Sequence, residues 1–474
     1  MKSRYIVFMI FIITTLTVAS CNRNEYTRLQ QTDISYPRVE LPEVTSELKI
    51  CMNSSLGPYK DAINTFIAHH PEINVTLEEI IDQWGPPDKI DAVKAERAAQ
   101  IQRIETELMS GYGADVFLLD ASFSSMSGLF PDLNKTSMSG AFLDLSPYVN
   151  GGNLIDLEEY YKVVITAMTY MDKQYLLPLT FNIPLGVSTE ANLKSIGFDM
   201  SKAQKDIYSF DDELFKKLPK DQYWAIFRGY EFSGNTEAVL IDYVNRTVHF
   251  DDETIRYVFE QFKATSGRLQ DEDLFGKFNY FVSLPNSDSA KRILDGDPFL
   301  CMLGQAGVEL THAQAITYCG TEPVLFPIPN EYGGLSADIF DCVAIRSNSE
   351  NAGTAMRLIQ FLLSAEVQSA HGYMNHNSIP VRRDALNEAI EWRKTGYGEA
   401  YGLGLDSLSE KNVVGLRKTL DRISCSRIQN RLNPVSGIEG VDIQKEIDQY
   451  VKGEITYDEM AEICGPRLIL YLNE

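Results

Sequence analysis

Motifs that carry chemistry in many proteins are missing from this chain of 474 residues. It contains no G-x-x-x-x-G-K-S/T phosphate loop, no G-x-S-x-G nucleophile elbow and no H-E-x-x-H zinc motif. Only six histidines are present, and the close sets, His69–His70 and His371 with His376, have no cysteine at ligand spacing. Carboxylates are so abundant that the sequence singles out no glycosidase pair. We therefore predict no catalytic residue, no metal site and no cofactor.

Basic residues are scarce as well. The chain has 43 Lys and Arg against 66 Asp and Glu, which gives a formal net charge of −23. Nucleic-acid binding needs basic patches for the phosphates, so we predict no nucleic-acid partner. The same acidity favours solubility. The length suits two domains.

The seven cysteines form no C-x-x-C pair, which argues against a structural zinc site. Cys51, Cys301 and Cys342 lie inside apolar, strand-like runs. Buried free thiols behave as small hydrophobic groups, and we favour that state over disulfides. The spacing of the cysteines leaves both states open.

The N-terminus has the features of a secretory signal. Two basic residues precede an apolar run from Tyr5 to Val18, and small residues follow. Cys21 comes directly after them, as in a lipobox, so we predict Cys21 as the lipidated N-terminus of the mature chain. The following residues are polar and predict a tether. Lipoprotein modification would supply the two or more acyl chains, palmitate among them, that stable anchoring needs. An uncleaved anchor and ordinary secretion are the alternatives.

The chain then has the pattern of a β-α-β unit. Residues 47–52 predict a strand, residues 59–70 a helix with one apolar face, and residues 73–78 an alternating second strand. This order fits a parallel sheet with a right-handed crossover. Three polar or aromatic residues follow these strands in loops: Asn53, Ser55 and Trp84.

A second stretch, from Ala95 to Val149, repeats the order of helix, strand and polar loop. The helix ends at Gly111 and Gly113, because glycine tolerates the left-handed C-cap conformation. Residues 114–120 form a mainly apolar run without alternation that is closed by the carboxylate of Asp120. Such a run is typical of a strand buried on both faces of a parallel sheet. Ligands of open α/β sheets bind outside the carboxyl ends of strands. Residues of the following loop are therefore candidates: Asp120, Ser122 and Phe123.

Two further segments are readable from local signals. Residues 153–171 predict a helix before an L-P strand. Near the C-terminus, Thr456-x-x-Glu459 has the spacing of a capping box, and a helix over the last residues follows from it.

The order of these segments resembles that of the extracellular solute-binding proteins of ABC importers, in the maltose-binding-like family 1. Residues 113–117 (GADVF) are similar to the family's strand before the site loop, and residues 140–148 to its G-x-F-x-D-L-S-P-Y segment. Residues 172–182 and 321–329 resemble the two interlobe crossovers. Residues 296–305 resemble the strand and loop of the site in the second lobe. The order of the motifs, over most of the chain, carries the resemblance.

The resemblance implies an α/β, two-lobed fold of the periplasmic-binding-protein type (class II). The ligand cleft would lie between lobes that are joined by crossover hinges near residues 178 and 326. The implied division of the chain is 1–20 signal peptide, 21–45 lipid-anchored linker, 46–178 and 326–370 first lobe, 179–325 second lobe, and 371–474 C-terminal helices of the second lobe.

The resemblance also implies where ligand contacts lie. Asn182 follows the first crossover, and Asp338 follows the second. Gln305 stands where many sugar binders of the family carry an aromatic residue, so a simple maltose-like site is in doubt. The implied ligand-binding set is Asn53, Ser55, Trp84, Asp120, Ser122, Phe123, Asn182, Gln305 and Asp338.

The implied function is that of a substrate-binding lipoprotein of an ABC transporter. It would capture a carbohydrate, an oligosaccharide, and deliver it to the transmembrane subunits of a permease without chemical change. The protein would act as a monomer, lipid-anchored to the cell membrane on its extracellular or periplasmic face. Three alternatives stay open: a secreted lipoprotein enzyme acting on glycans or peptides, a binder of a non-sugar solute such as a peptide or polyamine, and a surface protein without a small ligand.

Overall fold

The computed structural model describes residues 39–81, 89–121, 128–214, 216–217, 235–269, 287–295, 301–369, 378–399, 402–428 and 433–474. These residues belong to a single compact unit that spans Arg38–Glu474. The predicted signal peptide, Cys21, Trp84, Ser122 and Phe123 lie outside them. Among the described residues, none of the helices has the length and apolar character needed to cross a bilayer.

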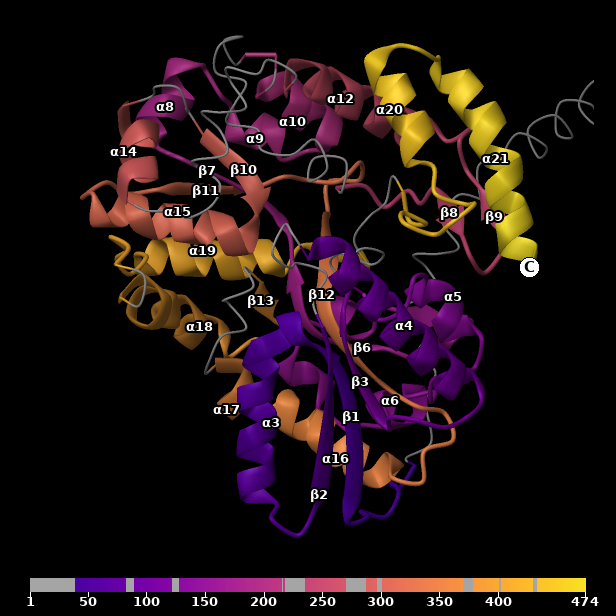
Figure 1. Cartoon of the computed structure of the whole chain (residues 1–474). Coiled ribbons are helices and arrows are strands. Elements are labelled where there is room, and N and C mark those ends of the chain that lie inside the picture. Colours follow the sequence, from indigo (N-terminus) through magenta and orange to yellow (C-terminus); the bar gives the residue numbers. More distant parts are fainter. Residues whose placement is uncertain are drawn as a thin grey trace, which may run out of the picture. The chain divides into compact units, whose positions relative to one another are not determined.

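The larger sheet has seven strands, in the order β13–β6–β12–β3–β1–β2, with β14 also paired to β12. Their bounds are β1 (Glu47–Asn53), β2 (Asn74–Ile80), β3 (Val116–Asp120), β6 (Leu177–Asn182), β12 (Leu335–Ile345), β13 (Ile379–Pro380) and β14 (Ile423–Ile428). β1 pairs in parallel with β2 and β3, whereas β12 runs antiparallel to β3 and β6. β1, β3 and β6 therefore run in one direction, and their carboxyl ends share one edge of the sheet (Figure 1).

The two predicted β-α units of the larger sheet are confirmed. Helix α3 (Gly57–His69) separates β1 from β2, and helix α4 (Ile90–Met109) precedes β3. Gly111 and Gly113, which end α4, have φ angles of 78° and 91°, as the left-handed cap requires. Helix α16 (Ala352–Leu362) packs against α3 and β1 and covers one face of the sheet (Figure 1).

The smaller sheet has three antiparallel strands, in the order β10–β7–β11. Their bounds are β7 (Pro184–Ser188), β10 (Cys301–Gln305) and β11 (Val324–Pro327). The chain enters this sheet directly after β6 and returns to the larger sheet through the connection from β11 to β12. Helix α15 (Ala306–Tyr318) packs along β7 and β10 (Figure 1).

A second, separate hydrophobic core lies among C-terminal and middle segments. It is built by β8 (Ile241–Asp242), β9 (Thr247–Val248), α12 (Glu253–Leu269), α20 (Gln444–Lys452) and α21 (Tyr457–Asn473). The predicted capping box of α21 is confirmed, with the Thr456 side chain on the Glu459 amide and the Glu459 carboxylate on the Thr456 amide.

Shorter elements connect these parts. Their bounds are η2 (Ser54–Leu56), α5 (Leu133–Met138), α6 (Ser146–Asn150), η3 (Leu157–Glu159), α7 (Lys162–Ile165), β4 (Thr169–Tyr170), β5 (Lys173–Gln174), α8 (Glu190–Ser195), α9 (Met200–Ala203), α10 (Ile207–Glu213), α14 (Ser287–Asp295), α17 (Ala365–Ser369), α18 (Leu386–Trp392), a π-helix η6 (Arg393–Gly398) and α19 (Glu410–Leu420). The segment 371–474, expected as helices, also contributes β13 and β14 to the larger sheet.

The helix predicted over residues 153–171 is wrong. That stretch forms only η3, α7 and the first strand of a hairpin. The backbone amide of Tyr161 donates to the carbonyl of Val381 (3.1 Å), and Tyr160 forms a β-bridge with Arg382. These long-range bonds take up backbone groups that a continuous helix would have paired within itself.

Among the described residues, free thiols are found at Cys51, Cys342, Cys425 and Cys464. Cys51 and Cys342 are fully buried in β1 and β12, which confirms the prediction for these two. The side chain of Cys301 lies outside the described residues. In the apolar interior these thiols pack as small hydrophobic groups.

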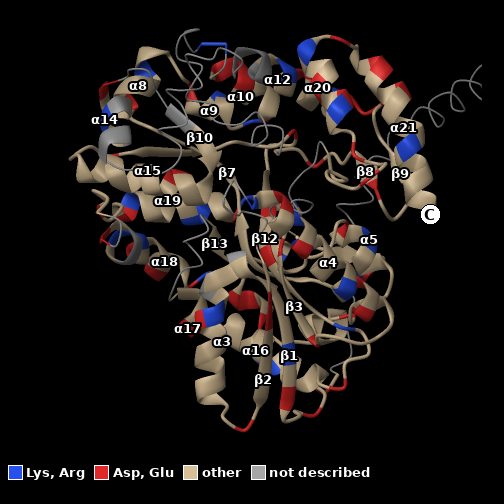
Figure 2. Cartoon of the chain, in the orientation of Figure 1, with Lys and Arg blue, Asp and Glu red and all other residues tan. Residues whose placement is uncertain are grey.

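Charges of both signs lie on several helices of the described chain. Lys and Arg lie beside Asp and Glu on α19, α20 and α21 (Figure 2). Several of these charges form exposed ion pairs, such as Arg256 with Asp458 and Arg383 with Asp421 (2.7 Å). Exposed pairs of this kind contribute about 0–1 kcal/mol each to stability. The buried apolar side chains of both sheets belong to one hydrophobic core.

The smaller sheet should be intolerant of a side chain at Gly186, the central residue of β7. A Cβ there would overlap the ring of Phe326 and lie 2.7 Å from a methyl carbon of Leu303. Gly186→Ala should therefore lower the free energy of unfolding by about 1–3 kcal/mol, as overpacked cores do. Gly415→Ala, inside α19 with open space around it, is the control. It should raise stability by about 1 kcal/mol in the same urea titrations, because alanine favours helix.

Candidate functional site

Polar side chains lie at one edge of the larger sheet, where three strands end. Asn53, Asp120 and Asn182 are the last residues of β1, β3 and β6. Asp338 is the register partner of Asn182 in the neighbouring strand β12. The carboxyl edge of an open α/β sheet is where such folds bind ligands. The structure thus brings these four predicted residues to the expected edge.

Gln305 reaches the same region from the smaller sheet. It ends β10, opposite Pro184 on β7, and is the N-cap residue of α15. The Asn182 side-chain oxygen accepts a hydrogen bond from the Gly307 amide (3.0 Å), and the Ile183 carbonyl accepts one from the Ala306 amide (2.8 Å). These bonds fix the start of α15 to the end of β6. Asn182 therefore joins the two sheets at the predicted site.

The predicted residues at this edge differ in burial. Asp120 is partly exposed, whereas Asn53, Asn182, Gln305 and Asp338 are each at most 8% exposed. The Ser55 side chain lies outside the described residues, as do Trp84, Ser122 and Phe123. Asp120 is thus the described member that is open to solvent.

A second carboxylate lies behind Asp120. Asp341 of β12 is the register partner of Asp120 across the antiparallel pair, and it is buried. Its Oδ2 accepts hydrogen bonds from the Tyr59 hydroxyl (3.0 Å) and the Thr180 hydroxyl (2.8 Å). Burial, and next the negative charge of Asp120, raise the pKa of Asp341 to about 7. The sequence signal was present, since Asp341 is a carboxylate inside the otherwise apolar run of residues 339–345.

Arg97 was also missed. It lies on α4 and is buried, with its guanidinium bonded to the Asn53 side chain and to two loop carbonyls. Arg97 shares a helix face with Ile101, Ile104 and Leu108, at spacings of four, seven and eleven residues. A charged residue on an apolar helix face is the signal that marks it.

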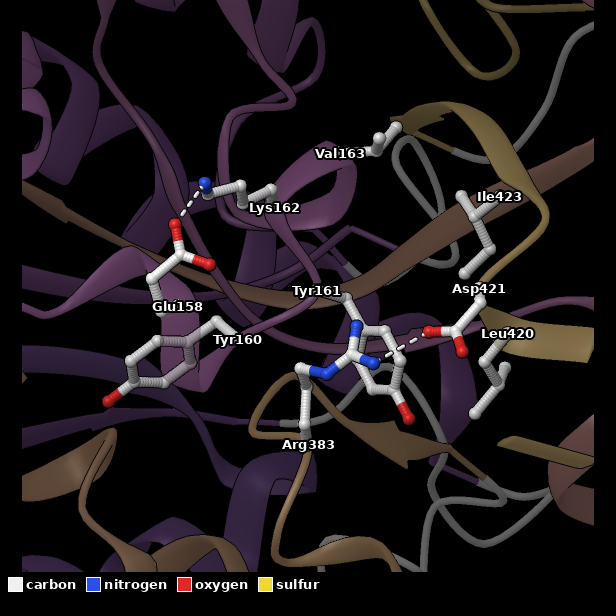
Figure 3. Close-up of a pocket in the computed structure, with 9 residues that line it drawn as sticks. All are labelled: Glu158, Tyr160, Tyr161, Lys162, Val163, Arg383, Leu420, Asp421 and Ile423. Atoms are coloured by element: carbon white, nitrogen blue, oxygen red, sulfur yellow. Dashed lines mark hydrogen bonds and ion pairs between the residues drawn. The ribbon is translucent and has the colours of Figure 1, made fainter. Parts of the chain in front are cut away.

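A pocket of about 440 Å³ opens elsewhere (Figure 3). In it, the Arg383 guanidinium lies over the ring of Tyr161, 5.1 Å from its centroid, and pairs with Asp421. Its lining consists of Glu158, Tyr160, Tyr161, Lys162, Val163, Arg383, Leu420, Asp421 and Ile423.

None of the predicted site residues that the structure describes lines this pocket. The Tyr161 ring packs on Phe181 (5.4 Å between centroids), and Phe181 faces away from its neighbours Thr180 and Asn182, because strand side chains alternate. The pocket therefore lies on the opposite face of β6 from Asn182. Its charges are paired within the chain, Lys162 with Glu158 and Arg383 with Asp421.

Replacing Asp341 should change how stability depends on pH. The folded chain keeps the Asp341 proton to a higher pH than the unfolded chain, where the ordinary pKa is 3.8. The free energy of unfolding therefore falls as the pH rises from about 4 to about 7. Asp341→Asn stays uncharged and removes this part of the fall. Its stability relative to the wild type should rise across that interval in urea titrations at several pH values.

A second variant checks the cause of that pKa. Asp120→Asn removes the neighbouring charge, which lowers the pKa of Asp341 and moves the fall in stability to lower pH. Parallel stability curves for the wild type and Asp341→Asn would contradict the assignment.

Comparison with known proteins gives a match by fold. No family model matches the sequence, and no curated protein matches it. Among solved structures, the sugar-binding protein MalE from Xanthomonas citri superposes with a TM-score of 0.57 at 14% identity, covering 90% of this chain and 97% of that one. A sugar transporter from Rhizobium etli, in an open conformation, gives a TM-score of 0.58 at 15% identity, covering 90% and 99%.

A third structure carries the name of the family. The extracellular solute-binding protein family 1 member from Alicyclobacillus acidocaldarius matches with a TM-score of 0.52 at 14% identity, covering 91% of this chain and all of that one. At these identities the likeness concerns the fold. The predicted fold class is confirmed: this chain has the two-lobed α/β fold of the extracellular solute-binding proteins.

Proposed function

We propose that this protein is the substrate-binding component of an ABC importer. Its ligand would be a carbohydrate, and more specifically an oligosaccharide. The observation that carries the proposal is the set of polar residues at one sheet edge, Asn53, Asp120, Asn182, Asp338 and Gln305, within this fold. Two of the structural neighbours are named as a sugar-binding protein and a sugar transporter. Delivery would be to the transmembrane subunits of a permease.

The chemistry of the edge suits sugar hydroxyls. A carboxylate accepts hydrogen bonds from hydroxyl groups, and an amide both donates and accepts them. Asp120 supplies the partly exposed carboxylate, and the amides come from Asn53, Asn182 and Gln305. The predicted aromatic residues, Trp84 and Phe123, would stack on sugar rings. Closure of the two lobes would then trap the ligand.

The paired carboxylates support a binder rather than a glycosidase. Glycoside hydrolysis needs two carboxyl groups that face the same glycosidic bond. Asp341 is buried behind Asp120 and is bound by Tyr59 and Thr180. It stabilises the sheet edge from within and does not face the solvent with Asp120.

Location and anchoring complete the proposal. The signal-like N-terminus and Cys21 point to a lipid-anchored protein on the extracellular or periplasmic face of the cell membrane, acting as a monomer. The same site in a binder of a peptide or polyamine would show a different ligand preference, which the next experiment reads directly.

Asp120 should contribute to ligand affinity, and the chain should still fold when its side chain is removed. We expect the mature chain, from about Val44, to melt at a higher temperature with one class of oligosaccharide, since a ligand at a hundredfold excess over its Kd adds about 2.7 kcal/mol. Asp120→Ala should weaken that binding by about tenfold to a hundredfold in calorimetric titration, as loss of a charged hydrogen-bond partner does. Asp61→Ala, exposed on α3, is the matched control and should bind normally.

The outcomes separate the alternatives. Equal affinity of Asp120→Ala and the wild type would remove Asp120 from the site. A shift with peptides or polyamines alone would replace the carbohydrate. A change in the mass of the glycan after long incubation would identify an enzyme.

Cys21 should decide the cellular location. Without the thiol no acyl chain can be attached, so Cys21→Ser should move the protein from the membrane fraction to the soluble fraction after expression in a bacterium. Fractionation followed by immunoblotting measures this, with Cys51→Ser as the control thiol. Retention of Cys21→Ser in the membrane would favour an uncleaved anchor.

A further inference from the structure

We propose that Arg97 is a positioning residue of the ligand site, which holds the ends of β1 and β2 and the chain at Gly128 in the arrangement that binds ligand. The proposal rests on the proposed function of that sheet edge. Arg97 itself lies on α4, behind the edge, and is only 6% exposed.

The guanidinium reaches three separate chain segments. Its Nη2 donates to the Asn53 side-chain oxygen (3.0 Å) and to the Gly128 carbonyl (3.2 Å), and its Nη1 donates to the Ile81 carbonyl. Asn53 ends β1, and Ile81 follows the last residue of β2. Gly128 lies on the chain that continues from β3. One side chain therefore connects the ends of β1 and β2 with the chain at Gly128.

Arginine suits this task because its donors form a planar, rigid fork. Two nitrogens of the fork serve three oxygens at once, which the single ammonium group of lysine cannot reproduce in this geometry. Hydrogen bonds from a charged donor are among the strong ones, and burial strengthens them further. The three segments are thus held more firmly than their own backbone contacts would hold them.

The contact with Arg97 also orients the side-chain amide of Asn53, a candidate ligand-binding group. Because the Asn53 Oδ1 faces the guanidinium, the Nδ2 of the same amide is directed away from it. An amide that is fixed in one orientation before the ligand arrives loses less conformational entropy on binding. Arg97 therefore raises ligand affinity through Asn53 and the two other segments that it holds, without touching the ligand.

The same helix offers a matched control. Arg103 lies on α4 as well, but its side chain is 44% exposed and it pairs with Glu78 and Glu107 at the surface. Surface pairs of this kind contribute little. Arg103 has the residue type, the helix and the charge of Arg97, and lacks the three-segment contact.

The test uses the mature chain with Arg97→Lys, Arg97→Gln, Arg103→Lys and Arg103→Gln. Hydrogen–deuterium exchange needs no ligand and reports how firmly the segments are held. In Arg97→Lys, exchange should rise by about tenfold or more in peptides that cover residues 53–57 and 128–133. The reason is that the variant loses the strong, charge-assisted hydrogen bonds that Arg97 donates to these segments. Exchange in β6 and β12 should stay as in the wild type. Both Arg103 variants should match the wild type within about twofold.

Binding is measured in parallel with maltotriose, mannotriose and cellotriose as separate probes. For any probe that the wild type binds, Arg97→Lys should lose about tenfold or more in affinity, through faster dissociation. Arg97→Lys keeps the buried charge, so it stays informative if Arg97→Gln fails to fold. Lysine at position 97 should not restore binding. If Arg97 only supported the fold, lysine would restore it.

Each outcome decides the proposal. Unchanged local exchange in Arg97→Lys, a uniform rise over both sheets, or wild-type affinity for a bound probe would overturn it. If the wild type binds none of the probes, the proposed sugar function loses support. The local hydrogen–deuterium exchange then still decides whether Arg97 holds the three segments together.

Discussion

The pairing of β12 with both β3 and β6 is the constraint on which the rest of the structure depends. All eleven residues of β12 are buried, and the strand returns from the smaller sheet into the middle of the larger one. Because it runs antiparallel to both neighbours, β3 and β6 must run the same way, and their last residues, Asp120 and Asn182, meet at one edge. A register slip of one residue would turn Asp338 and Asp341 to the other face and dismantle that edge.

The candidate site is supported from behind by buried polar groups. Asp341 is held by Tyr59 and Thr180, and Arg97 is held by Asn53 and loop carbonyls. Burying such groups costs free energy unless each finds its partners, so their placement depends on accurate packing. The partly exposed carboxylate of Asp120 therefore lies in front of buried side chains that are held by hydrogen bonds. Ligand sites gain affinity when their groups are fixed beforehand in this way.

Prediction from sequence succeeded where the signal is local. Local signals predicted the helix α4, the two glycines that end it and the strand β3. The structure has all of them as expected. Prediction failed at residues 153–171, because Tyr160 and Tyr161 bond to residues more than two hundred positions away. Arg97 and Asp341 were visible as polar residues in apolar patterns, yet their partners were not.

The sequence by itself determined the local elements and the places where strands end, because helix and strand periodicity, glycine caps and capping boxes act over a few residues. It therefore placed Asn53 and Asp120 at strand ends, whereas the position of Asn182 was implied by the family resemblance. Only the tertiary structure decided which strands are neighbours, and with them which side chains meet. Tyr59 and Asp341 are 282 positions apart in the chain, and Asn53 and Arg97 are 44 apart. No local pattern encodes such pairs; they form because packing of the two sheets brings their strands together.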